Sequence, residues 1–456
     1  MSLTGLIFLL AYAAGCLAAL ARHPVYGLMT YVAVFYLHPP SRWWGQALPD
    51  LRWSLLAALV TLIAAMVHRK QVDPVPLFHH KVMMGLLLFV AWIAIQTGWA
   101  MGVEIHVEFI VTFVKYLLLV GLIYKCIESV EHLRLVLWTH VAGCFYLGLI
   151  VLEQYLGGRF EGFGGPDINE ANSGALQVVT GIATAAALFL AGRPKEKAAL
   201  IGAIPVIVNA LISTLSRSGF LALTVTGLVF NILAPRKYLG RVRVLSVLAL
   251  VMFAMLTNPV YWARIASITY LGEEVEGVDT GAGRLVVIDA QWQMFKEHPL
   301  GCGHRCTAFL SPYYLADEHL TGKGDERARS SHNTFMSLLV EQGILGAAFY
   351  FALVLWIVSK ILALRRSLAG EDGFLACVYP AVAASLIAVF IGDLFVDYLK
   401  LEVRIWFLAF LMVLFKLEAA RHKSPVSSDA NPGVNLSQRA RPGRNVRQRR
   451  TSVGGG

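Results

Sequence analysis

Long apolar stretches separated by short polar ones recur along the chain from Leu3 to Leu417. A helix that crosses a bilayer needs about 20 mostly apolar residues, so the pattern predicts 12 or 13 membrane-spanning helices. The predicted spans cover residues 3–21, 24–38, 53–67, 82–101, 108–127, 132–156, 172–191, 198–215, 218–234, 243–257, 333–363, 375–392 and 403–418. The number stays open at the N-terminal end, where the proline- and tryptophan-rich segment 39–44 fits a short interfacial element as well as a full crossing.

Composition agrees with this pattern. Apolar residues make up 57% and charged residues 15% of the 456 positions, and mean hydropathy is +0.62, whereas soluble domains are roughly 45–50% apolar and about 25% charged. A soluble enzyme with one anchor is excluded, and the lack of strand-like alternation argues against an outer-membrane barrel. We therefore predict an all-α polytopic membrane protein with about 12 transmembrane helices. Residues 3–21 follow no basic segment and are interpreted as the first span, not as a cleavable signal.

Basic loops predict the orientation, because cytoplasmic loops carry the excess of Lys and Arg. If the spans alternate, one side receives the basic segments 68–70, 193–197, 236–243 and 365–366 and is therefore cytoplasmic. The external side receives residues 157–171 and a large loop, 258–332, whose seven Lys/Arg and ten Asp/Glu give a net charge of −3. The predicted parts of the chain are N-terminal transmembrane helices (1–257), the large external loop (258–332), C-terminal transmembrane helices (333–420) and a basic tail (421–456).

Most of the formal net charge of +10 belongs to the tail, where eight Lys/Arg and one Asp give +7. The run 439–450 is basic enough for nucleic-acid binding, but a disordered cytoplasmic tail beside anionic lipid is the simpler interpretation. We expect membrane lipids as partners and no nucleic acid.

The large loop is the predicted place of function, since loops of this length are uncommon unless they act. Apolar residues at helical spacing predict a helix over 285–295 that lies against the membrane face and ends at His298 and Pro299. Cys302 and Cys306 share the loop. They form a disulfide if the loop faces an oxidising space, and otherwise they are two free thiols; the sequence leaves both open.

Arg217 stands between two apolar spans in the segment Ser-Arg-Ser-Gly at 216–219. Ionisable residues at such a depth are costly and tend to be functional, and a guanidinium matches phosphate oxygens in a bidentate way. Snorkelling to lipid headgroups is the alternative. Arg284 is an ordinary solvated arginine or a second phosphate ligand, and two arginines on one face suit a diphosphate. Arg264, beside aromatic residues, fits an interfacial anchor better.

His332 lies directly before an apolar run, in the segment Ser-His-Asn-Thr at 331–334. A neutral imidazole, with an ordinary pKa of about 6.5, can accept a proton from a sugar hydroxyl. A helix-start histidine beside a capping Ser331 or Asn333 is an equal alternative. No metal-binding motif is present, so we expect neither a metal nor another cofactor. Three more histidines lie in the loop at irregular spacings: His298, His304 and His319.

Three blocks together resemble the O-antigen ligase and polymerase superfamily. The first, LSRSG at 215–219, resembles the family's Ser-Arg-Gly turn. The second runs from Arg284 through Trp292 to HPLGCG at 298–303 and resembles the family's Arg…Trp…Pro-Leu-x-Gly-x-Gly segment. The third, SHNTF at 331–335 followed by EQGILG at 341–346, resembles its His-Asn…Glu-x-Gly-Leu-x-Gly signature. The blocks follow in the family's order.

The resemblance, which is closest to O-antigen ligase, implies a metal-independent, inverting, GT-C-like glycosyltransferase. It implies transfer of a glycan from undecaprenyl pyrophosphate to a lipid A-core acceptor in lipopolysaccharide biosynthesis. The site would face the periplasm from the bacterial inner membrane, with 258–332 as a large periplasmic loop. Arg217 and Arg284 would bind the pyrophosphate, and His332 would deprotonate the acceptor hydroxyl. Further candidate substrate contacts are Asn333, Arg264 and Asn172, although residues 162–169 match the family's neighbouring stretch only loosely.

Other acceptors stay open. Residues 23–40 resemble a subgroup associated with exopolysaccharide or protein glycosylation, which would make the chain a polymerase or a protein O-oligosaccharyltransferase. A lipid-linked sugar transporter or flippase is the alternative of another class, and it predicts charges deep in several spans. Only Lys115 clearly lies inside an apolar run, and snorkelling or one structural ion pair explains it as well.

Overall fold

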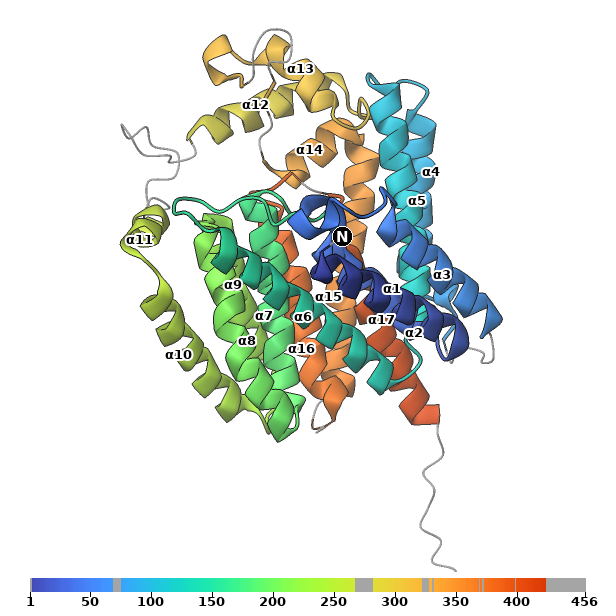
Figure 1. Cartoon of the computed structure of the whole chain (residues 1–456). Helices are drawn as coiled ribbons and strands as arrows, with labels where there is room; N and C mark the ends of the chain where they lie inside the picture. Colours follow the sequence, from blue (N-terminus) through green and yellow to red (C-terminus); the bar gives the residue numbers. More distant parts are fainter. Residues whose placement is uncertain are drawn as a thin grey trace, which may run out of the picture.

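The computed structural model describes residues 2–68, 75–266, 282–321, 328–329, 332–368, 370, 373–397 and 399–423. These residues form α-helices and short 3-10 helices, and an isolated bridge pairs Thr321 with Ala328. The predicted all-helical class is therefore confirmed for the described part of the chain (Figure 1).

Each predicted span up to residue 257 corresponds to one helix. These helices are α1 (Leu3–Ala21), α2 (Val25–Leu37), α3 (Trp53–Val67), α4 (Lys81–Gln96), α5 (Val103–Cys126), α6 (Val130–Gln154), α7 (Ala171–Ala191), α8 (Pro194–Ser213), α9 (Arg217–Leu233) and α10 (Leu239–Leu256). The segment between α2 and α3 contains two 3-10 helices, η1 (Pro39–Ser41) and η2 (Trp43–Gly45). The C-terminal helices are α14 (Thr334–Glu341), α15 (Gly343–Ser367), α16 (Phe374–Gly392) and α17 (Glu402–Lys423).

Among the described residues, eight helices are long and apolar enough to cross a membrane. Three further apolar helices, α3, α4 and α9, are shorter. The chain is thus a polytopic membrane protein, as predicted. The eight long helices are α1, α5, α6, α7, α8, α10, α15 and α16.

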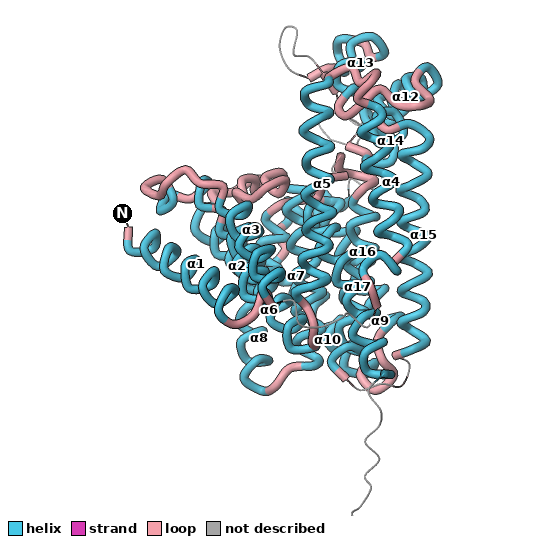
Figure 2. Tube along the Cα trace, turned by 90° about the vertical axis from the view of Figure 1, so that its right-hand side faces the viewer, coloured by secondary structure: helices cyan, strands magenta, loops and turns pink. Residues whose placement is uncertain are grey.

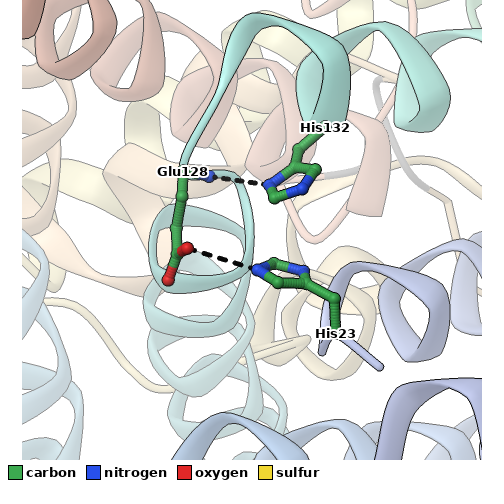
Figure 3. Close-up of side chains that lie close together, drawn as sticks. All are labelled: His23, Glu128 and His132. Atoms are coloured by element: carbon green, nitrogen blue, oxygen red, sulfur yellow. Dashed lines mark hydrogen bonds and ion pairs between the residues drawn. The ribbon is translucent and has the colours of Figure 1, made fainter. Parts of the chain in front are cut away.

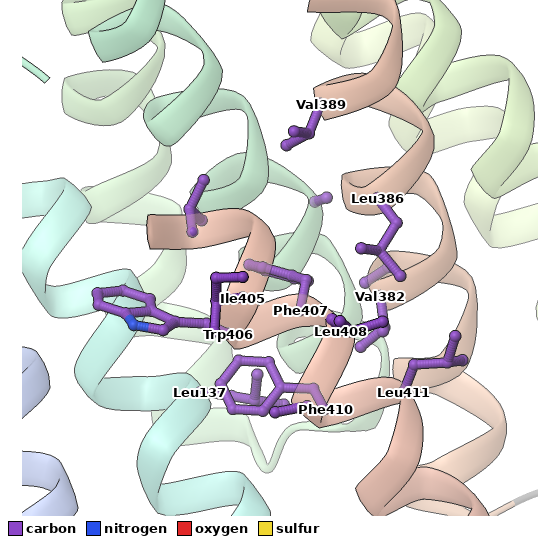
Figure 4. Close-up of a cluster of buried hydrophobic side chains, with 14 of the residues drawn as sticks. Leu137, Val382, Leu386, Val389, Ile405, Trp406, Phe407, Leu408, Phe410 and Leu411 are labelled. Carbon is purple, nitrogen blue, oxygen red and sulfur yellow. The ribbon is translucent and has the colours of Figure 1, made fainter. Parts of the chain in front are cut away.

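Helices α16 and α17 lie at the centre of the bundle, where α16 packs against α7, α9 and α17, and α17 packs against α5. Their facing side chains form a continuous apolar core (Figure 4). Trp406 of α17 is fully buried there, together with Leu386 of α16 and Leu137 of α6. Burial of such side chains contributes about 1.5–3 kcal/mol each, so this core holds segments together that are far apart in the sequence.

The apolar run 333–363 is not the single helix that its composition predicts. It is broken at Gln342 between α14 and α15, and Gly343 has a φ of +68°. A Cβ on Gly343 would lie 2.2 Å from the carbonyl carbon of Leu300, so glycine allows the large loop to approach the backbone here. Ile344 N–H donates to the carbonyl of Pro299 across this contact, at 2.9 Å. A loop contact therefore breaks the run.

The described part of the large loop contains three helices: α11 (Pro259–Ala266), α12 (Ala282–Glu297) and α13 (Cys306–Tyr314). Helices α12 and α13 and the residues between them form a cap over one end of the bundle (Figure 1, Figure 2). Helix α12 confirms the helix predicted over 285–295, and its buried face, which includes Val287 and Met294, packs on α13 and α14. Figure 2 shows α12 and α13 above α14, at the end where α4, α5 and α15 extend beyond α1–α3.

Charged side chains within α17 correct the expectation that Lys115 is the only charge clearly inside an apolar run. Arg404 is 3% exposed and donates from both terminal nitrogens to the carboxylate of Asp393, at 2.6 and 2.7 Å. Lys416 is also buried and donates to the carbonyl of Tyr124. Both cations have a protein partner, which fits structural pairing.

We expect Asp393→Ala to destabilise the protein by about 3–5 kcal/mol, because it leaves the Arg404 charge buried without compensation. Thermal unfolding in detergent measures the loss. The double variant Asp393→Ala/Arg404→Met, which removes both charges, should recover much of the stability. An Asp393→Ala protein that unfolds at the wild-type temperature would show that this pair does not hold α16 and α17 together.

Candidate active site

The start of α9 positions Arg217. Ser216 is the N-cap, and its Oγ accepts a hydrogen bond from Gly219 N–H at 3.0 Å, which makes Arg217 the first residue of the helix. The same hydroxyl donates to Oδ1 of Asn172 at 2.8 Å. Because Asn172 is in the first turn of α7, this bond places the half-buried Arg217 beside the start of α7.

Asn172 also receives a hydrogen bond from outside the two helices. Its Oδ1 accepts from Nη2 of Arg159 at 3.3 Å, in the loop that precedes α7. On the other side of the turn, the buried Tyr261 of α11 donates its hydroxyl to the carbonyl of Ser216 at 3.0 Å. Asn172, predicted as a substrate contact, therefore joins the loop before α7 to the start of α9. The side chain of Arg264, also on α11, lies outside the described part of the structure.

His332 and Asn333 lie just before α14 and have different structural roles. Asn333 is the N-cap of α14, and its Oδ1 accepts from Met336 N–H at 3.1 Å. His332 has a φ of +49°, a conformation that few residues other than glycine adopt. Thr334 N–H donates to the carbonyl of Asp393 at 2.8 Å, which ties this segment to the end of α16. Asn333, one of the two predicted capping candidates, is thus the cap of α14, and the other candidate, Ser331, lies outside the described residues.

Charged groups from three segments act on the imidazole of His332. Burial is the largest cause that lowers its pKa, and the guanidinium of Arg284 on α12 is the next. Arg329 and Arg159 lower this pKa further, whereas Glu170, the residue before α7, raises it. The pKa of His332 therefore lies below its ordinary value, and the neutral imidazole, which can accept a proton, is favoured.

These contacts bring the predicted residues to one end of the bundle. Arg284 lies close enough to His332 to lower the pKa of the imidazole, and the start of α7 connects both to Arg217 through Glu170, Asn172 and Ser216. The arrangement provides a basic imidazole beside guanidinium groups. Such a set can bind an anionic leaving group and accept a proton from a nucleophile.

A buried carboxylate near this end was not singled out by the sequence. Glu341, the last residue of α14, is 6% exposed and accepts from Oγ1 of Thr307 at 3.0 Å. Nδ1 of His304 lies 2.9 Å from its second oxygen, and the His304 ring stacks on Phe109 with centroids 4.1 Å apart. His304 therefore connects the cap to α14. The available signal was Glu341 itself, which is the first residue of the segment EQGILG in the third motif block.

The cap contains the disulfide that the sequence left open, between Cys302 and Cys306. Backbone hydrogen bonds surround it: Met101 N–H donates to the carbonyl of Cys302, and Gly303 N–H donates to the carbonyl of Glu341, each at 2.9 Å. The disulfide thus lies where the cap, the turn between α4 and α5, and the end of α14 meet.

Replacing both cysteines by serine should lower thermal stability and leave most of the transfer activity. The closed loop is short, so the loss should be at most about 2–3 kcal/mol, and neither cysteine is among the residues that act on His332. Unfolding temperature and turnover measured on one preparation test this. Loss of all transfer in a folded Cys302→Ser/Cys306→Ser protein would contradict it.

Three side chains at the opposite end of the bundle are close enough to consider as metal ligands: His23, Glu128 and His132 (Figure 3). Nε2 of His23 lies 3.2 Å from Oε2 of Glu128, and Nδ1 of His23 accepts from Val25 N–H at 3.1 Å. Nδ1 of His132 accepts from Glu128 N–H at 3.4 Å. A nitrogen that accepts carries no proton, so each neutral ring is protonated at Nε2. The cluster is thus arranged as a hydrogen-bonded contact between the turn that joins α1 to α2 and the turn that joins α5 to α6.

Residues 200–351, one third of the chain, match the family model described as O-antigen ligase. The match includes Arg217, Arg284 and His332. It begins at residue 200, so Asn172 lies outside it. No curated protein matches the chain. Residues 200–351 of this polytopic membrane protein therefore form an O-antigen ligase domain.

Proposed function

We propose that the protein is an O-antigen ligase-like glycosyltransferase that moves a glycan from undecaprenyl pyrophosphate to a lipid A-core acceptor. The observation that carries the proposal is the half-buried position of His332 near Arg284, where burial and then the charge of Arg284 lower the pKa of the imidazole. A general base must be unprotonated at the working pH, and this environment favours that state. The start of α7 connects this pair to Arg217.

In the proposed reaction, His332 accepts the proton of the acceptor hydroxyl, whose oxygen attacks the anomeric carbon of the donor. The new glycosidic bond forms as the bond from that carbon to the diphosphate oxygen breaks, with inversion. Undecaprenyl pyrophosphate leaves with the electron pair, and Arg217 and Arg284 stabilise its charge. Because the two guanidinium groups supply positive charge at the leaving group, we expect transfer without a divalent ion.

We further propose that this site faces the periplasm of the bacterial inner membrane. Two features support this orientation. Arg365 and Arg366 lie in the last turn of α15, at the end away from the cap, which fits a cytoplasmic end there. The Cys302–Cys306 disulfide lies in the cap, and disulfides persist in oxidising compartments such as the periplasm.

The proposal is tested by incubating purified protein with undecaprenyl-pyrophosphate glycan and each candidate acceptor, in the presence of a chelator and without nucleotide. Glycosylated lipid A-core supports ligase activity. Elongated glycan or glycosylated protein would instead make the chain a polymerase or a protein O-oligosaccharyltransferase. Transport of lipid-linked sugar across vesicles, without transfer to any acceptor, would overturn the assignment in favour of a transporter. Full inhibition by chelator, reversed by one divalent ion, would contradict the metal-free mechanism.

A further inference from the structure

A groove separate from the candidate active site runs between α2, α3 and α5, with a cavity volume of about 450 Å³. Its walls are leucines from α3 and α5, and its mouth contains four ionisable side chains. The wall leucines are Leu55, Leu59, Leu62, Leu118, Leu119 and Leu122. The mouth contains His38, Asp50, Arg52 and Lys115. The groove thus combines an apolar channel with a charged opening, as a site for an amphipathic molecule requires.

Lys115 lies at the charged mouth of the groove although it is in the middle of a helix. In the sequence Lys115 lies in the middle of the apolar run of α5. The first turns of α5, however, rise to the cap, where Gly102 approaches the ring of Phe309 on α13. The next residue, Tyr116, donates its hydroxyl to the carbonyl of Lys400, in the segment between α16 and α17. Lys115 therefore lies level with the loops at that end of the bundle, where lipid headgroups lie.

The charges at the mouth favour an anion. Arg52 and Lys115 are exposed cations, and Asp50 is the only acid among the residues that line the groove. Burial, and then the nearby Arg42, lower the pKa of His38, so its imidazole is neutral. The net charge of +1 matches the single negative charge of a phosphodiester.

We propose that this groove binds an anionic glycerophospholipid, with its phosphodiester between Arg52 and Lys115 and an acyl chain along the leucines of α3 and α5. Cationic side chains at headgroup level attract anionic lipids. Contact between the acyl chain and the leucine side chains buries apolar surface and adds to the affinity. A zwitterionic lipid offers the same chains but no net charge to the two cations.

The lipid would also brace the loop that leads to the candidate active site. Pro166, in the loop before α7, lines the groove. Arg42 is buried beside it and donates to the carbonyls of Leu37 and Phe163, at 3.0 and 2.6 Å, which fastens that loop to the end of α2. The same loop contains Glu170, which acts on His332. Occupancy of the groove should therefore stabilise the folded protein as a whole.

The test uses delipidated full-length protein in a non-ionic detergent, to which phosphatidylglycerol or phosphatidylcholine with identical chains is added. Phosphatidylglycerol should raise the unfolding temperature more than phosphatidylcholine, and native mass spectrometry should show it bound. Lys115→Gln and Arg52→Gln should each weaken its apparent affinity about tenfold, the loss expected for one charge-assisted contact. Asp50→Asn, which removes the competing acid, should strengthen it. The matched control is Arg22→Gln, because Arg22 is an exposed cation at the C-terminal end of α1 and does not line the groove.

Opposite changes in Lys115→Gln and Asp50→Asn, with Arg22→Gln unchanged, would support the site. Equal stabilisation by both lipids would overturn it, as would an affinity for phosphatidylglycerol that none of the groove variants alters. Inorganic phosphate that reproduces the full effect would show an anion site without a lipid and would also overturn it. If Lys115→Gln does not fold, the sign of the Asp50→Asn change decides.

Discussion

Replacing His332 by Asn is expected to slow glycan transfer by about 10²–10⁴-fold, the usual contribution of a general base, while donor binding persists. Asparagine is chosen because it tolerates the φ of +49° at this position, where alanine would add backbone strain. The capping residue Asn333 is untouched, so α14 should keep its start. The loss would then report on the imidazole itself.

Donor binding and single-turnover transfer should be measured on the same purified His332→Asn protein. A stable variant that transfers at nearly the wild-type rate would remove His332 from the role of base. An equal loss of donor binding and transfer would assign it to binding instead.

The pH dependence provides a second readout of the same residue. Transfer requires the unprotonated imidazole, so the rate should rise with pH through the pKa of His332 and level off above it. Arg329 lowers this pKa and Glu170 raises it. Arg329→Gln should therefore move the acidic limb of the profile to higher pH, and Glu170→Gln should move it to lower pH. A limb that neither variant shifts would indicate that another group titrates.

Loss of either Arg217 or Arg284 should have the second largest effect. We expect Arg217→Ala and Arg284→Ala each to lower the transfer rate by about 10²–10³-fold, as removal of one charge-stabilising donor does in other enzymes. Lysine at either position should restore little, because an ammonium lacks the planar bidentate fork. Arg284→Ala should also raise the pKa of His332 and shift the acidic limb of any residual activity upward.

Radiolabelled donor consumption by folded variants measures these losses, with Arg243→Ala as the control. Arg243 is an exposed arginine near the start of α10, at the end of the bundle away from the cap. Wild-type transfer by a correctly folded Arg217→Ala protein would exclude Arg217 from the pyrophosphate site.

The positions of most helices could be predicted from sequence because their apolar runs cover nearly the same residues, as 53–67 shows for α3. The break at Gln342 was not predicted, although Glu341, Gln342 and Gly343 interrupt the apolar residues there. The close approach of Gly343 to Leu300 at the break is a property of the folded protein. The buried charge of Arg404 was missed for the same reason. Its partner, Asp393, follows a different helix, and their pairing is a property of the folded bundle.

Part of the candidate site could be predicted from local sequence motifs. The motif blocks indicated Arg217, Arg284 and His332, and the structure places Arg284 close enough to His332 to alter its pKa. The capping role of Asn333 and the bridge that Asn172 makes to Ser216 depend on side-chain direction, which a motif does not specify. The roles of these residues in transfer remain predictions until the variants are measured.

The hydrogen bonds around the Cys302–Cys306 disulfide have a consequence for biogenesis. They join the turn before α5, at Met101, to the end of α14, at Glu341, so they connect parts that leave the ribosome far apart in time. Chains fold from the N-terminus as they are made. The cap can therefore dock only after α14 has been synthesised. A nascent chain would thus contain Arg217 before the cap is complete, so the candidate site would be assembled only late in membrane insertion.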